Sequence, residues 1–146
     1  MRKVTLVFFF LALHSFYPSR AQQVVQRIDF TKSSRGFLEE LTITQDSVSI
    51  KTENARSSVL RYQRSEKLEE KKWAQIRSVV ESLSLAEIPL YKSPTMKRSF
   101  DGALHATLTI TTAAGDSYTH GFDDENPHPN LRALMKCIQE IRKGVR

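Results

Sequence analysis

Five side chains that could bind a metal ion or transfer a proton lie within nine residues of one another: His120, Asp123, Asp124, Glu125 and His128. Asp101 could join them if the chain folds back at the start of the preceding strand. Histidine and carboxylate are ligands that zinc and similar ions prefer. However, none of the recognised metal-binding spacings is present, and a helix dipole stabilises carboxylates before a helix without any metal. The sequence therefore predicts no bound metal, and a metal-dependent enzyme is the third of three functional hypotheses.

Other catalytic patterns are missing from the sequence as well. The chain has no Gly-x-Ser-x-Gly elbow and no glycine-rich phosphate loop, and it contains only 5 glycines. Asp29 with Glu39, or Asp101 with Asp123, could in principle form an acid and base pair, but nothing fixes a useful separation between them. We therefore expect no catalytic residue, no cofactor and no enzymatic activity.

The stretch 100–142 predicts two strands, a tight turn, an acidic loop and a helix. Residues 104–111 alternate between apolar and polar, and Ala114-Gly115 as a two-residue turn would pair Thr107 with Phe122. In this register one face of the hairpin is aliphatic and packs on the helices. The other face carries threonines together with Tyr118, His120 and Phe122. An exposed face of this kind is a candidate surface for a protein partner.

Two loops add further candidate binding residues, because loops on a rigid scaffold often carry binding. Arg35-Gly36 and Asp101-Gly102 each stand at the start of a strand. An ion pair from Arg35 to Asp101 or to Asp123 could hold the two halves of the sheet together. The same residues could instead bind a partner, or be ordinary surface charges that contribute little stability.

The first residues have the pattern of a signal peptide. Arg2 and Lys3 precede the apolar run 4–13, and Ser19-Arg20-Ala21 places small residues where a signal peptidase reads them. We expect residues 1–21 to be cleaved, leaving 22–146 as one exported domain, periplasmic or secreted, with no membrane span. A run of ten residues is too short to cross a bilayer.

The charge of the processed chain argues against nucleic acid as a partner. Removal of three basic residues leaves 22 − 3 = 19 basic side chains against 16 acidic ones, a net charge of +3. Basic and acidic residues are interleaved, and no stripe of basic and aromatic residues is present.

The remaining patterns predict a single α+β domain. An antiparallel sheet of about five strands carries two helices on one face, in the order ββ(ββ)αββα. Strands are expected at 24–31 and from Phe37, with the turn Gln45-Asp46 pairing Leu41 with Ile50, and a weaker strand at 59–63.

Two helices complete the predicted domain. The first begins near Glu69, where Leu68 and Trp73 occupy the positions of a hydrophobic staple. The last begins at the N-cap Asn126 and ends at Gly144. The single cysteine, Cys137, lies near the apolar side of the last helix and is expected to be a buried structural thiol.

Three blocks of sequence carry a family resemblance: S-S-R-G-F at 33–37, F-D-G-A-L-H-A-T-L-T-I at 100–110 and F-D-D-E-N-P-H-P at 122–129. Over nearly the whole processed chain they resemble an uncharacterised family of small exported Bacteroidota proteins, which implies no activity. The chain is also similar to emfourin, the protealysin-associated inhibitor of metallopeptidases. That similarity consists of a Gly-Phe turn opening the second strand, an Asp before a T-L-T-I-like strand, and the closing pattern L-R-A-L-M-K-C-I at 131–138. Emfourin-like chains carry paired glycines where this chain has Arg35-Gly36, and their acidic loop is shorter.

The leading functional hypothesis is thus a small exported binding module for a protein partner, with peptidase inhibition as the role that the second resemblance implies. The alternative is a structural or assembly protein of the cell envelope.

Overall fold

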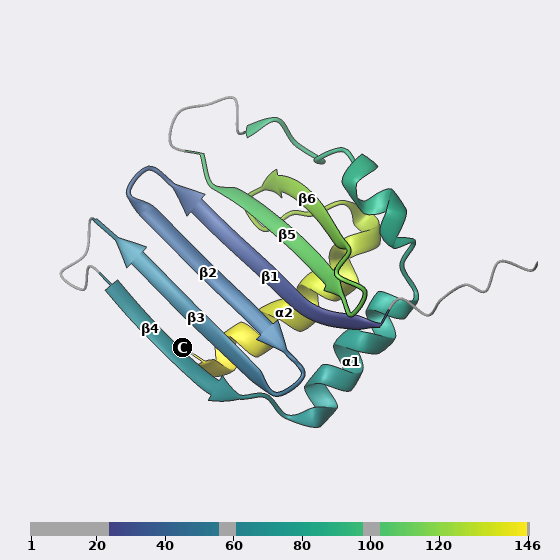
Figure 1. Ribbon diagram of the computed structural model, residues 1–146. Coiled ribbons are helices and arrows are strands. Elements are labelled where there is room, and N and C mark those ends of the chain that lie inside the picture. The colour runs from purple at the N-terminus through teal and green to yellow at the C-terminus, as the bar shows by residue number, and fades with distance from the viewer. Residues whose placement is uncertain (1–23, 56–60, 98–102, 146) are drawn as a thin grey trace, which may run out of the picture.

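The computed structural model describes residues 24–55, 61–97 and 103–145, and shows one antiparallel sheet of six strands with two helices (Figure 1). The strands, in the spatial order β4-β3-β2-β1-β5-β6, are β1 (Val25–Ser34), β2 (Phe37–Thr44), β3 (Ser47–Asn54), β4 (Arg61–Lys67), β5 (His105–Thr112) and β6 (Ser117–Asp123). The helices are α1 (Glu70–Glu81) and α2 (Arg132–Val145), with short 3₁₀ turns η1 (Leu85–Leu90) and η3 (Pro129–Leu131). The predicted α+β class, a single domain with one antiparallel sheet and two helices, is confirmed. The described residues form six strands and not about five, because Arg61–Lys67, which overlaps the weaker strand predicted at 59–63, is a full strand of the sheet.

Turn chemistry fixes the first half of the sheet. Gly36 has φ +77°, a left-handed conformation that glycine adopts without strain, and it closes the two-residue turn between β1 and β2. The predicted turn at Gln45-Asp46 is confirmed, since Leu41 pairs with Ile50 across β2 and β3. A register shift between Val25 and Arg27 places Val25 inside, so the simple alternation expected for 24–31 holds only from Ile28 onward.

The register expected for the β5–β6 hairpin is wrong by one residue. Thr112 N donates to Asp116 O at 2.9 Å, and Gly115 has φ +91°, so the loop contains three residues instead of two. Phe122 consequently pairs with Ala106 and not with Thr107. A shift of one residue moves every side chain of a strand to the opposite face.

The face assignment of β6 is corrected accordingly. Its alternate side chains Tyr118, His120 and Phe122 lie on the helix-covered face, where His120 and Phe122 are buried and Tyr118 is half-buried. The open face holds the hydroxyl pairs Thr109–Thr119 at 3.0 Å and Thr111–Ser117 at 3.2 Å. The aromatic binding face predicted for the hairpin therefore does not exist.

Both helices lie on one face of the sheet, α2 behind the central strands and α1 beside it (Figure 1). Leu68 and Trp73 are both buried at the start of α1, as the hydrophobic staple requires. The start expected for α2 is wrong: Pro129 disfavours helical geometry at the preceding His128, so a helix cannot run on from an N-cap at Asn126. His128 is extended, with φ −50° and ψ 143°, and caps η3. α2 then continues through Gly144 to Val145.

The core lies between the helices and the covered face of the sheet, and it includes Trp73 and Cys137 as predicted. Burial raises the pKa of the Cys137 thiol, as expected for a structural cysteine. None of the described helices is long and apolar enough to cross a membrane. The predicted signal peptide lies outside the described residues.

Candidate functional site

A cluster of four charged side chains lies between the covered face of the sheet and α2. Lys32 of β1, Glu39 of β2 and Arg142 of α2 are 8%, 0% and 9% exposed, and Glu125 reaches them from the loop after β6. Arg142 Nη1 lies 2.7 Å from Glu125 Oε1 and 3.2 Å from Glu39 Oε1. Lys32 Nζ lies 2.9 Å from Glu125 Oε1 and 3.5 Å from Glu39 Oε1. Two positive and two negative charges thus balance inside the protein, which buried charges require.

The cluster determines the ionisation of Glu125. Burial by itself raises the pKa of a carboxyl group, but hydrogen bonds from Arg142, Lys32 and Gln139 outweigh it and lower the pKa of Glu125 to about 2. The pKa of Arg142 is raised, because the hydrogen bond and charge of Glu125 outweigh the effect of burial. Glu125 is therefore a carboxylate at every ordinary pH, and it fixes the loop to two separate elements, β1 through Lys32 and α2 through Gln139 and Arg142.

The same loop is attached on its other side to the segment before residue 98. The carboxylate of Asp123 is 0% exposed and accepts hydrogen bonds from Thr95 Oγ1 at 2.6 Å and Lys97 N at 2.9 Å. Lys97 Nζ lies 2.7 Å from Asp124 Oδ2, and this hydrogen bond raises the pKa of Lys97. Asp124 has φ +55°, which aspartate tolerates better than most residues. Asp123 and Asp124 thus bind the 95–97 segment, and the next residue, Glu125, binds the buried cluster.

A row of ring contacts connects the buried cluster to the surface. Arg142 lies over Phe30 at 6.0 Å, and Phe30 stacks on Phe122 at 6.4 Å. Phe122 stacks on His120 at 5.5 Å, and His120 meets the edge of Tyr91 at 6.0 Å. At the outer end His128 stacks on Tyr91 at 4.2 Å. Tyr91 therefore lies between two histidines that the sequence had suggested as metal ligands.

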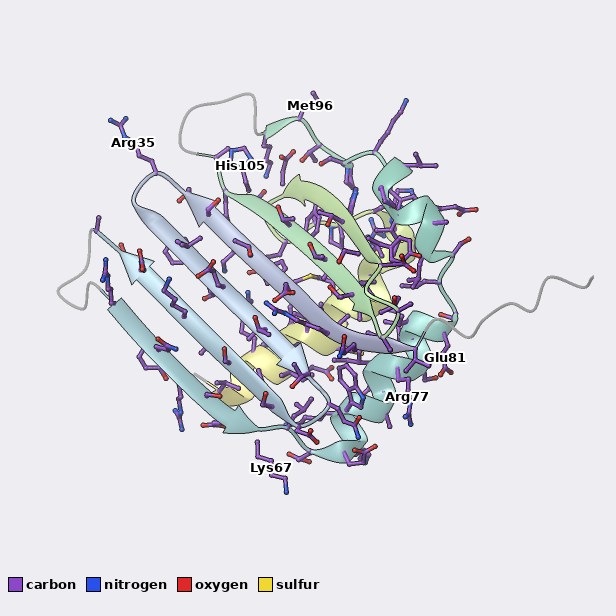
Figure 2. The ribbon with its side chains drawn as sticks, viewed as in Figure 1. Arg35, Lys67, Arg77, Glu81, Met96 and His105 are labelled. Carbon is purple, nitrogen blue, oxygen red and sulfur yellow. The ribbon has the colours of Figure 1, made fainter. Side chains whose placement is uncertain are left out.

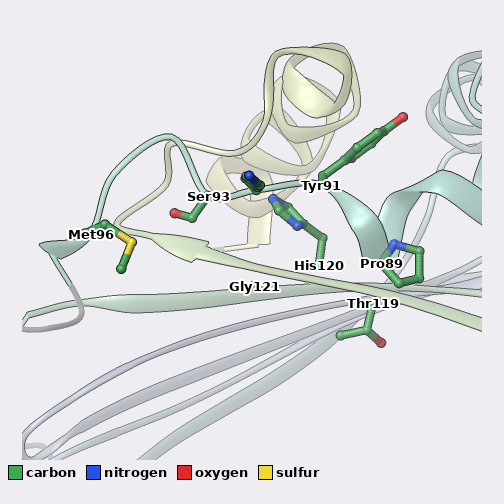
Figure 3. A pocket seen from close by; sticks show the side chains of 8 residues that line it. Pro89, Tyr91, Ser93, Met96, Thr119, His120 and Gly121 are labelled. Atoms are coloured by element: carbon green, nitrogen blue, oxygen red, sulfur yellow. The ribbon is translucent and has the colours of Figure 1, made fainter.

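A groove opens at the end of this row, between the outer edge of β6 and the segment that follows η1 (Figure 3). We call it the β6 groove. It has a volume of about 390 Å³ and is lined by Pro89, Tyr91, Lys92, Ser93, Met96, Thr119, His120 and Gly121. Figure 3 shows His120 pointing from β6 toward Tyr91 and Ser93, whereas Thr119 points to the other side of the strand. Met96 is 65% exposed and Leu90, beside Tyr91 in sequence, is 78% exposed.

The structure separates the residues that the sequence grouped as possible metal ligands. His120 and His128 contact Tyr91, Asp123 and Asp124 bind the 95–97 segment, and Glu125 enters the buried cluster. Within residues 24–55, 61–97 and 103–145, no group of three His, Cys, Asp or Glu side chains is placed to hold a metal ion. Asp29 and Glu39, the proposed acid and base pair, engage different partners: Asp29 binds Arg27 and Thr42, and Glu39 lies in the cluster.

Two of the remaining candidate residues, Arg35 and Gly36, lie at the end of the sheet where β1 turns into β2. Arg35 and Gly36 are exposed in the β1–β2 turn, and Arg35 points away from the sheet (Figure 2). Asp101 and Gly102 lie outside the described residues, so the Arg35–Asp101 ion pair stays a prediction.

Sequence reasoning missed Lys32 and Arg142 in the cluster and Tyr91 and Met96 in the β6 groove, and it considered Glu39 only as a possible acid and base partner of Asp29. A signal for Lys32 and Glu39 was present. Lys32 follows Ile28 and Phe30 in the inward phase of β1, and Glu39 precedes Leu41 in that of β2. Charged residues in phase with an apolar stripe indicate buried ion pairs.

Comparison with known proteins gives no family model that matches the chain, and no match among curated proteins.

Proposed function

We propose that the processed chain is an exported binding module that engages a protein partner at the β6 groove. The observation that carries this proposal is the position of Leu90 and Met96. Isolated exposed apolar residues are common, but these two large side chains stand on the one segment that also supplies Tyr91 to the groove. An aromatic residue and methionine beside a concave surface are typical of the centre of protein interfaces.

The anchoring of the groove supports the same proposal. Its outer wall is attached to β6 through Thr95, Lys97 and Asp123, and its floor rests on the stacked rings of His120 and Phe122. A surface held in one conformation before binding loses less entropy when a partner arrives, which favours affinity. No such argument supports an enzyme, because the acidic and imidazole side chains near the groove each have a structural contact.

The class of partner is proposed from the resemblance to emfourin. A metallopeptidase of the protealysin type is the first candidate, and the expected effect is inhibition. Export through the predicted signal peptide would place the module in the compartment where secreted peptidases act.

The test uses the processed protein, residues 22–146, as bait in an envelope fraction and in direct binding to protealysin. Met96→Asp places a charge at the rim of the groove and should reduce partner recovery at least about tenfold. Val24→Asp is the matched control, since Val24 is 51% exposed and lies outside the groove. Recovery of one stoichiometric partner by wild type and Val24→Asp but not by Met96→Asp supports the proposal. Equal recovery of the partner by all three proteins, or recovery of no partner at all, would refute the proposal. Inhibition of protealysin by the processed protein tests separately whether the partner is a metallopeptidase.

A further inference from the structure

The strand beside the β6 groove is an open edge of the sheet. Within the part of the chain that the structure describes, β6 is the last strand in the spatial order and pairs only with β5. The hydrogen bonds from Asp124 N to Leu104 O at 2.8 Å and from Thr112 N to Asp116 O at 2.9 Å fix which residues face β5. In an antiparallel pair these residues alternate, so even-numbered positions of β6 bond to β5 and odd-numbered positions direct N–H and C=O outward.

Two of these outward positions, Thr119 and Gly121, line the groove. Both residues are exposed, and a Cβ atom at Gly121 would have no neighbour within 4 Å. Among the described residues, no hydrogen bond involves the outward backbone groups of either one. The two positions are about 7 Å apart along the strand, which is the repeat of an extended chain.

The opposite edge of the sheet is different. β4 carries Arg61, Arg64 and Lys67 within seven residues, and charged side chains on an edge strand discourage another strand from pairing. The stretch of β6 from Tyr118 to Gly121 has no lysine, arginine or acidic residue. The two edges therefore differ in how readily they accept a strand, and the uncharged one is the edge beside the apolar rim.

We infer that β6 accepts an extended peptide segment of the partner as a seventh strand, hydrogen-bonded to the backbone of Thr119 and Gly121. This inference rests on the proposed function and specifies how the partner is recognised. Alternate side chains of an added strand point to opposite faces. The peptide segment thus places one apolar side chain between Tyr91 and Met96. The two adjacent side chains of the peptide then lie on the open face of the sheet.

The test begins with selection of linear 12-residue peptides from a random library on the immobilised processed protein, followed by measurement of Kd. Gly121→Pro removes the outward N–H, while the bonds between β5 and β6 involve only the neighbouring residues. Gly121→Ala keeps the N–H and measures the effect of added bulk alone. Gln63→Pro makes the same change on β4. The hydrogen bond from Leu68 N to Asp46 O shows that even-numbered residues of β4 bond to β3, so the N–H of Gln63 points outward.

The expected result is a rise in Kd of at least about tenfold for Gly121→Pro, a smaller rise for Gly121→Ala and no rise for Gln63→Pro. Selected peptides that bind Gly121→Pro as tightly as wild type would overturn strand addition but leave the Met96-dependent partner standing. Failure to select any peptide would also overturn it. Dimerisation of the free protein that Gly121→Pro abolishes would assign the edge to a second copy instead.

A second measurement covers the case in which Gly121→Pro does not fold. In the wild-type protein, amide hydrogen exchange at Thr119 and Gly121 should slow on addition of a selected peptide, whereas exchange at Gln63 should not change. Unchanged exchange at the two β6 amides would contradict the inference.

Discussion

Arg142 binds Glu125 through two parallel hydrogen bonds, from Nη1 to Oε1 at 2.7 Å and from Nη2 to Oε2 at 2.9 Å. This pair connects the last helix to the loop after β6, and Arg142 also contacts the fully buried Glu39. Replacing one member of a buried ion pair leaves its partners without compensation, which costs about 3–5 kcal/mol. Arg142→Met should therefore lower the free energy of unfolding by roughly that amount in urea denaturation.

Lys143→Met is the matched control for this experiment, because Lys143 is exposed on the next position of α2. Its effect should stay within about 0.5 kcal/mol. Equal stability of the two variants would show that the cluster contributes no more than a surface ion pair.

The acid stability of the protein should depend on Glu125. Its pKa in the folded protein is about 2, below the 4.5 of an unperturbed glutamate. Because the folded pKa is the lower one, ionised Glu125 stabilises the fold above about pH 4.5, and this contribution is lost as the pH falls toward 2. Urea denaturation of wild type and Glu125→Gln between pH 7 and pH 2 measures the effect. The stability difference should be largest at pH 7 and shrink below pH 4.5, and a difference independent of pH would contradict the assignment.

The sequence predicted the fold well wherever hydrophobic pattern and turn chemistry agreed. At Gln45-Asp46 the turn and the apolar pairs Leu41–Ile50 support the same register, and that register is observed. In the β5–β6 hairpin the residues Ala113-Ala114-Gly115 allow a two- or a three-residue loop, and both satisfy the alternation of β5. Only the pattern of β6 could distinguish the two registers, and its alternating residues Tyr118, His120 and Phe122 were assigned to the wrong face of the sheet. An aromatic stripe in a strand next to helices belongs to the core.

The candidate site could be predicted only in part. The acidic loop 123–125 was recognised as special, but its partners are far away in sequence: Glu125 and Lys32 are separated by 93 positions. Such contacts depend on how strands are ordered in the sheet, which local patterns do not specify. The groove was missed for a similar reason, since Tyr91 and Met96 belong to an irregular segment whose position is fixed by Asp123.

The corrected hairpin register can be tested with Phe122 and Thr107, which the sequence had placed opposite one another. Phe122 is 1% exposed in the core, so Phe122→Ala should cost about 3–5 kcal/mol. Thr107 is exposed on the open face, so Thr107→Ala should cost less than about 1 kcal/mol. Thermal denaturation of both variants distinguishes the registers, because similar small losses would place Phe122 back on the exposed face.

One substitution should stabilise the protein. Thr112, at the end of β5, is 1% exposed, and among the described residues its Oγ1 atom has no hydrogen-bond partner. A buried hydroxyl without a partner loses its hydration and gains nothing in return, whereas valine has nearly the same shape and no polar atom to desolvate. Thr112→Val should therefore raise the free energy of unfolding by about 1 kcal/mol, as measured by urea denaturation. Thr111→Val is the neighbouring control, because Thr111 Oγ1 lies 3.2 Å from Ser117 Oγ on the open face, and loss of that contact should leave stability unchanged or slightly reduced. Destabilisation by Thr112→Val, with no such effect from Thr111→Val, would mean that the Thr112 hydroxyl has a partner in solution.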